Sequence, residues 1–331
     1  MTPAAFERPA PSAPPPRIAG IDVARGIAIV AMVIFHAAYD LSTFRLIATD
    51  VANSPGWRLF AGAIGGSFLT LVGVSLVLAT QQEINWPAFL RRLALVAGGA
   101  ALVTLGTWLW MPDFFVFFGI LHLIALGSVI ALPFLTLPPV LTLAAAGLCF
   151  ALPLLIAIPA LDQRWLLWTG LSQLPIDTAD YYPVLPWFGF VLLGVALARI
   201  AVSQGWTARL AAFRAEDRPS RLLTWMGRRS LPIYLIHQPV LIGLISAFVW
   251  LRPTAALPPM RADAETRPFV EACMRTCVSN GKAADECQDA CQCTADGLRR
   301  DGLWRQALSG QMSTTERTRV GEIARVCTQG E

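Results

Sequence analysis

Long apolar runs separated by short polar stretches recur along most of the chain. Seven such segments lie near residues 20–40, 59–80, 90–110, 114–135, 138–158, 182–200 and 230–251. An α-helix needs about 20 predominantly apolar residues to cross the hydrocarbon core of a bilayer, and these segments approach that length. The pattern therefore predicts an all-α fold, a polytopic transmembrane helix bundle of about seven spans.

Composition supports a membrane protein and argues against a nucleic-acid-binding one. The 331 residues are 55% hydrophobic and only 15% charged, whereas soluble domains carry about 25% charged residues. The formal net charge of +4 is small, and the sequence shows no basic footprint of the kind that nucleic-acid-binding domains carry. The lipid bilayer is the expected partner, and no nucleic acid is expected.

The two ends of the chain differ from this apolar region. Residues 1–17 are rich in Pro and Ala without helical periodicity, so we expect a disordered leader and no cleaved signal peptide. A transmembrane domain is expected over 18–252 and a cysteine-rich helical tail over 262–331. If all seven segments span, most loop arginines share the side of the N-terminus, and the opposite short loops hold few. The positive-inside rule then places the N-terminus in the cytoplasm and the tail outside.

Cysteine positions give an independent indication of where the tail lies. Six of the seven cysteines fall in the tail: Cys273, Cys277, Cys287, Cys291, Cys293 and Cys327. An even set in a short polar segment suggests disulfides, which persist outside the cytoplasm. A zinc or iron–sulfur site is the alternative, but the tail has no histidine and this spacing is unusual for structural zinc. We therefore expect no metal.

The spacing of these cysteines favours one pairing among the fifteen that six cysteines allow. Two Cys-x3-Cys pairs place their members four residues apart, on one face of each of two helices, and Asn280-Gly281 is a natural turn between them. An antiparallel hairpin would join Cys273 to Cys291 and Cys277 to Cys287. Cys293 would then reach Cys327. The fold expected for the tail is a small disulfide-stapled helical unit.

The first apolar segment, IDVARGIAIVAMVIFHAAYDL, carries titratable groups at both ends. Asp22 and Arg25 begin it, and His36 and Asp40 end it, the last two spaced so that both project from one helical face. From Arg25 to His36 is about 16 Å of helix at 1.5 Å per residue. Such groups are costly in lipid and usually pair or line a wet cavity. The alternative is that they only anchor the helix ends at the two interfaces.

All three histidines of the chain lie in apolar segments: His36, His122 and His237. A titratable side chain within the membrane is a functional candidate, and a neutral imidazole can act as a base or as a nucleophile. The alternative for each is a hydrogen bond to a neighbouring helix that serves packing alone.

Five blocks in order carry a resemblance to a known family. They are IDVARGIAIVAMVIFH, FLTLVGVSLVLA (68–79), FGILHLIALG (118–127), DYYPVLPWFGFVLLG (180–194) and GRRSLPIYLIHQP (227–239). Over roughly residues 18–251 the chain resembles the bacterial branch of the heparan-α-glucosaminide N-acetyltransferase catalytic domain family. The first block, with Arg, ten residues and then His, is similar to the opening of the transmembrane acyltransferases, and the last block also resembles the ending of the wider acyltransferase-3 group. The tail lies outside this resemblance.

The resemblance implies an integral membrane acyltransferase that takes an acyl group, most simply acetyl, from cytoplasmic acyl-CoA. The acceptor would be an amino sugar or glycan on the outer side, and the enzyme would sit in the bacterial inner membrane, with its tail in the periplasm. Acetyl-CoA would be a co-substrate, without any tightly bound cofactor. Both O- and N-acyl transfer stay open.

The same resemblance suggests roles for individual residues. His36 would be the catalytic base or nucleophile, with Asp40 orienting its ring. The guanidinium groups of Arg25, Arg228 and Arg229 would bind the phosphates of CoA, whereas the basic pair Arg91 and Arg92 is expected to be topological.

Five further residues are expected in the cavity or at its outer end. Asp22 would pair with Arg25, and His122 and His237 would line the centre. Asp180 and Tyr182 would meet the acceptor, although aromatic residues at an interface more often form a belt.

One departure means that the catalytic role cannot be carried over from the lysosomal members of the family. In lysosomal members the reactive histidine follows the corresponding helix in a lumenal segment, and residues 41–60 contain no histidine. The assignment of His36 therefore rests on its distance from Arg25 and on its own position. Two other classes stay open, a small transporter or permease with a polar path, and a membrane anchor whose tail binds a partner. Internal repeats typical of transporters are not evident.

Overall fold

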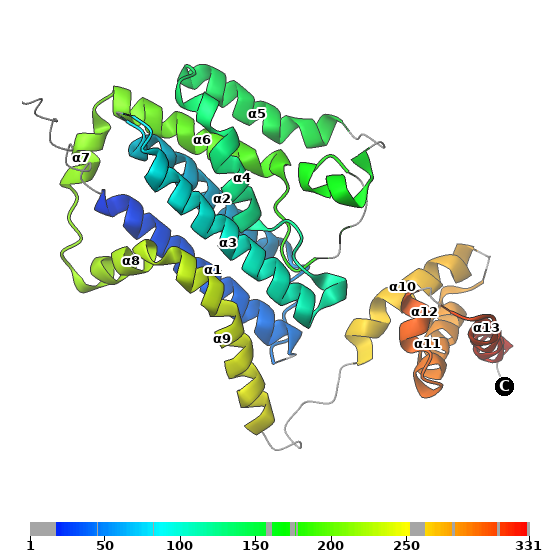
Figure 1. Ribbon diagram of the computed structural model, residues 1–331. Helices are drawn as coiled ribbons and strands as arrows, with labels where there is room; N and C mark the ends of the chain where they lie inside the picture. The colour runs from blue at the N-terminus through cyan, green and yellow to red at the C-terminus, as the bar shows by residue number, and fades with distance from the viewer. Residues whose placement is uncertain are drawn as a thin grey trace, which may run out of the picture. The chain divides into compact units, whose positions relative to one another are not determined.

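The computed structural model describes residues 18–44, 46–81, 83–156, 161–172, 176, 178–251, 262–279, 282–309 and 312–329 (Figure 1). The leader expected at 1–17 and the Asn280-Gly281 turn lie outside these residues. Within them the chain is helical, and an isolated bridge joins Phe118 to Tyr181. The predicted all-α membrane bundle is confirmed.

Five helices in the described part of the chain are long and apolar enough to cross a membrane: α1 (Ala19–Thr43), α2 (Pro55–Ala79), α3 (Trp86–Trp110), α6 (Val184–Ser203) and α9 (Ser230–Leu251). Two shorter apolar helices, α4 (Ile120–Ile130) and α5 (Pro139–Leu155), occupy the places of the fourth and fifth predicted segments. Short 3-10 helices, η1 (Pro112–Phe114), η2 (Leu132–Leu135) and η4 (Arg164–Thr169), interrupt the connections.

Helix α4 covers only half of the predicted segment 114–135. Gly119 precedes it with an extended backbone, and Pro133 lies in the η2 turn that follows it. A proline cannot continue an α-helix because it lacks the backbone N–H and clashes with the preceding turn. The apolar run is therefore longer than the helix that it forms.

Helices α2 and α6 approach each other closely in the membrane domain. Gly73 of α2 faces the Val191 carbonyl of α6, and Gly194 of α6 faces the Thr70 carbonyl of α2. A β-carbon at either glycine would overlap the opposing backbone, so small residues are what allow this close approach. The buried core around this contact includes Leu69, Val72 and Leu76 from α2 and Val191, Leu192 and Val195 from α6.

Two helices on the polar side of the domain connect α6 to α9. Helix α7 (Trp206–Ala212) is short, and α8 (Arg218–Arg228) begins at Asp217, whose side chain accepts a hydrogen bond from the Ser220 amide at 2.9 Å. Helix α8 packs its small residues against the first turns of α1, where Gly26 and Gly227 each face a backbone carbonyl of the other helix. This contact brings the beginnings of α1 and α9 together.

Helices α3 and α9 present mostly apolar side chains outward. Among the described residues Gly99 and Ala100 are buried along α3, and Ile245 is buried along α9. Exposed leucines and tryptophans on the remaining faces are what a helix in contact with lipid carries.

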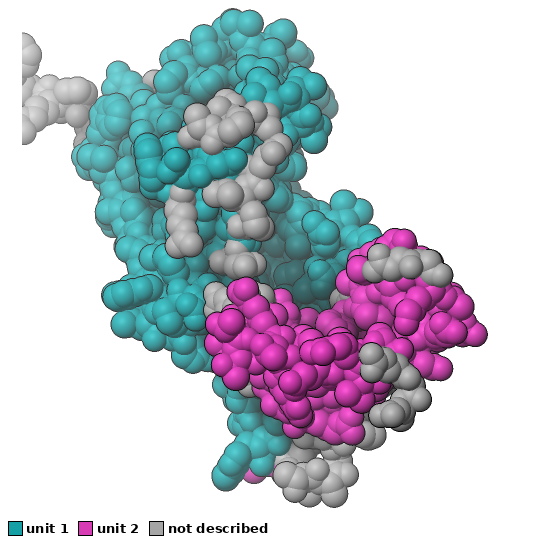
Figure 2. All heavy atoms as spheres, turned by 90° about the vertical axis from the view of Figure 1, so that its right-hand side faces the viewer, with its two compact units in different colours: residues 1–250 teal, residues 251–331 magenta. Residues whose placement is uncertain are grey.

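The chain divides into two compact units, Met1–Trp250 and Leu251–Glu331, which Figure 2 colours separately. The second unit consists of α10 (Ala262–Ser279), α11 (Ala284–Arg300), α12 (Trp304–Ser309) and α13 (Thr314–Gln329). Its buried centre contains Cys287, Cys291, Ala295 and Leu298 on one face of α11.

Three disulfides hold this unit together. They join Cys273 to Cys291, Cys277 to Cys287 and Cys293 to Cys327, with S–S distances of 1.94, 1.96 and 2.00 Å. The first two tie α10 to α11 and the third ties α11 to α13, which is the pairing that the hairpin interpretation favoured. The remaining cysteine, Cys149, is free in α5.

Candidate functional site

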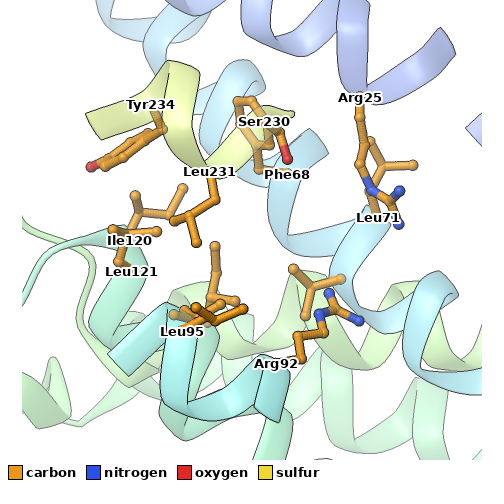
Figure 3. A pocket seen from close by; sticks show the side chains of 13 residues that line it. Arg25, Phe68, Leu71, Arg92, Leu95, Ile120, Leu121, Ser230, Leu231 and Tyr234 are labelled. Carbon is orange, nitrogen blue, oxygen red and sulfur yellow. The ribbon is translucent and has the colours of Figure 1, made fainter. Parts of the chain in front are cut away.

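A cavity of about 190 Å³ lies between α1, α2, α3, α4 and α9 (Figure 3). Its wall is mostly leucine, isoleucine, valine and phenylalanine side chains. Four polar residues contribute to the lining: Arg25 of α1, Arg92 of α3, and Ser230 and Tyr234 of α9. Helices far apart in the sequence therefore enclose one apolar space with two cationic groups on its wall.

Arg25 is held in place by neighbours on two helices. Its Nη1 donates a hydrogen bond to Asp22 Oδ1 at 2.9 Å, and its Nη2 donates to Ser75 Oγ of α2. Asp22 is buried, and its other oxygen accepts from Arg228 Nε of α8 at 3.1 Å. One carboxylate thus serves two guanidinium groups, and the three residues together carry one net positive charge.

The remaining arginines divide between the cavity and the surface. Arg228 binds Asp22, and the guanidinium of Arg229 lies 5.0 Å from the ring centre of Trp225. Neither lines the cavity, whereas Arg92 does. Leu95 and Val96 follow Arg92 by three and four residues, so all three lie on one face of α3 and line the same cavity. This spacing could have indicated from the sequence that Arg92 faces inward. Sequence reasoning ranked this residue low because a basic pair beside a span is usually topological.

His36 of α1 and His237 of α9 face each other with ring centres 4.9 Å apart. The Nδ1 of His237 lies 2.6 Å from the Tyr234 carbonyl oxygen. A carbonyl only accepts hydrogen bonds, so Nδ1 carries the proton and Nε2 of the neutral ring is left as an acceptor. Two histidines separated by about 200 positions in the sequence therefore form one pair.

Asp40 bonds across the helix pair, to Gln238. The Gln238 Nε2 donates to Asp40 Oδ1 at 2.8 Å, and Asp40 is only 4% exposed. The sequence suggested that Asp40 would orient His36, but the hydrogen bond that the structure gives it reaches α9. Gln238 was missed, although a glutamine directly after a histidine in an apolar helix was a usable signal.

One face of α9 connects the cavity to the histidine pair. Ser230, Leu231 and Tyr234 line the cavity, and His237 follows Tyr234 by three residues, with ring centres 5.8 Å apart. Three residues correspond to about 4.5 Å along a helix. The histidine pair therefore lies less than one helical turn of α9 beyond the cavity lining.

His122 and Asp180 both complete the beginning of α4. The His122 Nδ1 accepts from the Gly119 amide at 3.2 Å, and its Nε2 lies 3.1 Å from Thr104 Oγ1. Asp180 Oδ2 accepts from the Ile120 amide at 3.0 Å. The amide groups at a helix N-terminus have no partner within the helix, so side chains such as these supply one.

Asp180 also reaches the cavity lining. The Tyr234 hydroxyl donates to Asp180 Oδ2 at 3.3 Å, so this carboxyl group fixes a cavity residue as well as α4. Burial raises the pKa of Asp180 to about 6. Tyr182 packs against Gly65 and against Trp187, with ring centres 4.6 Å apart, within the α2–α6 contact.

The model for the catalytic region of heparan-alpha-glucosaminide N-acetyltransferases matches residues 17–239. The chain belongs to this family. No curated protein and no solved structure matches the chain significantly. Membership in the heparan-alpha-glucosaminide N-acetyltransferase family implies an acetyltransferase, and the apolar helices place that activity in a membrane protein.

The family match covers the whole candidate site. It begins just before α1 and ends at Pro239, directly after His237 and Gln238. The disulfide-bonded unit lies outside it, as expected from the sequence. Within the described residues, no group of three or more histidine, cysteine or carboxylate side chains is arranged to hold a metal ion. The described part of the site contains imidazole, carboxylate and guanidinium groups.

Proposed function

We propose that this family member transfers an acetyl group from cytoplasmic acetyl-CoA to an amino sugar or glycan on the outer side of the membrane. The observation that carries the proposal is the continuity between the arginine-bearing cavity and the histidine pair along one face of α9. A thioester that enters beside the arginines would meet an imidazole at the far end.

The donor end of the cavity suits a phosphorylated carrier. Guanidinium groups match the geometry of phosphate oxygens and bind them with charge-assisted hydrogen bonds. Arg25 and Arg92 both line the cavity, and Arg25 is fixed by Asp22 and Ser75. Its position about 16 Å of helix away from His36 leaves room for the extended pantetheine arm of CoA between the phosphates and the reacting carbon.

The reaction then follows from the chemistry of a neutral imidazole. His36 accepts a proton from the amino or hydroxyl group of the acceptor as that group forms a bond to the thioester carbonyl carbon. The carbon–sulfur bond breaks, and the imidazolium returns the proton to the departing thiolate. His237 faces His36 across the helix contact, so it is placed to influence the ring orientation of the base.

The proposed orientation in the membrane rests on the odd number of apolar helices, on the loop arginines and on the disulfides of the tail. The described residues contain five long apolar helices and two shorter ones, α4 and α5. If the five or all seven span, the odd number supports opposite sides for the N-terminus and the tail. Loop arginines favour a cytoplasmic N-terminus, and disulfides persist outside the cytoplasm. Both lines of reasoning assign the donor side to the arginine end of the cavity.

The test uses the full chain in lipid nanodiscs with radiolabelled acetyl-CoA and glucosamine as the acceptor probe. We expect transfer by the parent protein and loss of transfer in His36→Gln, with acetyl-CoA binding unchanged. Gln204→Leu, at an exposed position after α6, serves as the control for handling and folding. Equal transfer by the parent and His36→Gln would remove His36 from the mechanism. Failure of the parent to bind acetyl-CoA would overturn the proposed function.

A further inference from the structure

Three buried side-chain atoms of the membrane domain have no hydrogen-bond partner among the described residues. They are Asp40 Oδ2, His237 Nε2 and Gln238 Oε1. They come from the same contact between α1 and α9, since Gln238 binds the other oxygen of Asp40 and His237 precedes it. Buried polar groups are almost always hydrogen-bonded, and a group that is not costs free energy. Three of them at one helix contact indicate a place where a ligand group binds.

All three atoms are hydrogen-bond acceptors. A carboxylate oxygen and an amide oxygen only accept, and the contact of His237 Nδ1 with the Tyr234 carbonyl leaves Nε2 as an acceptor in the neutral ring. The amide of Gln238 is oriented by its bond to Asp40, which requires a donor. A group that satisfies this set must donate several hydrogen bonds and need not accept any.

An ammonium group fits this requirement better than a hydroxyl group. An ammonium ion on a carbon carries three N–H donors, whereas a hydroxyl group carries one and would leave two of the three acceptors unpaired. Asp40 is also a nearly inaccessible carboxylate with no ion pair to a described side chain. Charged groups within a membrane segment are costly unless they are paired, so a cationic ligand compensates Asp40 as well.

The position of this cluster suits the acceptor of the proposed reaction. Asp40 lies one turn beyond His36 on α1, on the side away from Arg25, so His36 lies between the donor arginines and the cluster along the helix. An amino group seated there approaches from the end opposite the donor phosphates. His36 beside it first accepts one ammonium proton and releases it to solvent, which frees the nitrogen lone pair; during the transfer the same ring takes the second proton and passes it to the departing thiolate.

We propose that Asp40, His237 and Gln238 form the acceptor subsite and that the subsite seats an amino group arriving as an ammonium ion. The inference rests on the proposed function for the identity of the bound molecule as an acceptor. Gln238 is a binding and positioning residue in this account, because it holds one oxygen of Asp40 and presents its own carbonyl oxygen to the ligand. The principal role of Asp40 is then ligand binding, and orientation of His36 is secondary.

The experiment measures equilibrium binding of probes to the full chain in nanodiscs, without turnover. The probes are glucosamine, ethanolamine as a minimal amine, glucose as the hydroxyl analogue of glucosamine, and acetyl-CoA. The variants are Asp40→Asn, which keeps shape and removes charge, and Gln238→Leu, which removes the amide. Gln204→Leu is the matched control, and thermal unfolding in the same nanodiscs checks that each variant folds.

We expect the parent to bind glucosamine and ethanolamine at least tenfold more tightly than glucose. Asp40→Asn and Gln238→Leu should each weaken amine binding at least tenfold and leave acetyl-CoA binding within twofold of the parent. Gln238→Asn, which retains an amide on a shorter chain, should restore part of the loss. Amine affinity within twofold of the parent in both folded variants would overturn the inference, as would a parent that binds neither amine or that binds glucose equally well.

The outcomes separate this inference from the proposed function. If amine binding depends on Asp40 and Gln238 but acetyl-CoA does not bind, the transferase proposal fails, and the residues form an amine-binding site that is not an acceptor subsite. If acetyl transfer depends on His36 but amine binding ignores both substitutions, the transferase proposal stands and the subsite fails. Should Asp40→Asn prove unfolded, Gln238→Leu and Gln238→Asn decide the matter.

Discussion

Arg92 offers the sharpest test of the donor site because its neighbour in the sequence is a built-in control. Arg91 and Arg92 have the same charge and lie in the second turn of the same helix, yet of the two only Arg92 lines the cavity. We expect Arg92→Gln to raise the KM for acetyl-CoA and to leave kcat nearly unchanged. We expect Arg91→Gln to change neither.

The magnitude follows from the charges around the cavity. Arg25, Asp22 and Arg228 already compensate one another in part, whereas Arg92 has no carboxylate bonded to it among the described residues. A hydrogen bond to a charged group contributes about 1.5–3 kcal/mol, which corresponds to roughly tenfold to 150-fold in affinity. The lower end of this range, about tenfold, is expected because Arg25 also lines the cavity and can still hold the phosphates when Arg92 is replaced.

The assay compares acetyl-CoA with S-acetylpantetheine, which lacks the nucleotide and its phosphates. If Arg92 binds phosphate, Arg92→Gln weakens the use of acetyl-CoA about tenfold and has no effect on S-acetylpantetheine. An equal effect on the two donors would show that Arg92 acts on the shape of the cavity. An equal effect of Arg91→Gln and Arg92→Gln would show that only the overall positive charge at this end of α3 matters. Either result would refute direct binding of phosphate by Arg92.

Three further predictions concern stability and the contact between α1 and α8. Asp180→Ala should lower thermal stability by about 1–3 kcal/mol, because the Ile120 amide and the Tyr234 hydroxyl lose their acceptor, and Asp180→Asn should be milder because an amide oxygen can replace it. Because burial raises the pKa of Asp180 from 3.8 to about 6, its protonated form stabilises the fold below pH 3.8 and this contribution is lost as the pH rises through about 6. Asp180→Asn should reduce the change of the free energy of unfolding with pH. If Asp180→Asn leaves this pH dependence unchanged, Asp180 is not its source. Gly227→Ala should separate α8 from α1 at Asp22 and reduce acetyl-CoA binding, whereas Gly205→Ala, with open space around its β-carbon, should leave binding intact despite its strained backbone. Finally, reducing the disulfides should unfold the second unit, since each closed loop contributes about 2–4 kcal/mol; a far-ultraviolet circular dichroism spectrum of that segment unchanged by reductant would contradict this.

The sequence allowed the membrane helices to be predicted well because apolar length is a local property. The tail cysteines were also accessible, since their spacing of four residues fixes one face of each helix. The segment 114–135 was predicted as a full span because hydrophobicity alone does not register the breaks at Gly119 and Pro133. Periodicity reports where apolar residues continue, whereas helix ends depend on single backbone positions.

The site was harder to predict because it depends on the register between helices. Nothing local in the first helix shows that Asp40 meets Gln238 about 200 positions later, or that Arg228 binds Asp22 and so lies away from the cavity wall. Sequence reasoning therefore assigned Asp40 to its neighbour on the same helix, whereas its hydrogen bond reaches Gln238 on another helix. Contacts between distant segments depend on how the helices pack. In this chain Gly26 and Gly227 allow α1 and α8 to approach closely.

Pro239 interrupts the hydrogen bonding of α9 directly after His237 and Gln238. Its ring nitrogen has no hydrogen to offer, so the carbonyl of Leu235, four positions earlier, loses its usual helical bond. The family match stops at this same position. The two parts of α9 are therefore constrained differently. The side chains before Pro239 must keep their contacts with α1, whereas those after it must mainly remain apolar. Substitutions that conserve hydrophobicity should accordingly be tolerated after Pro239 and not before it.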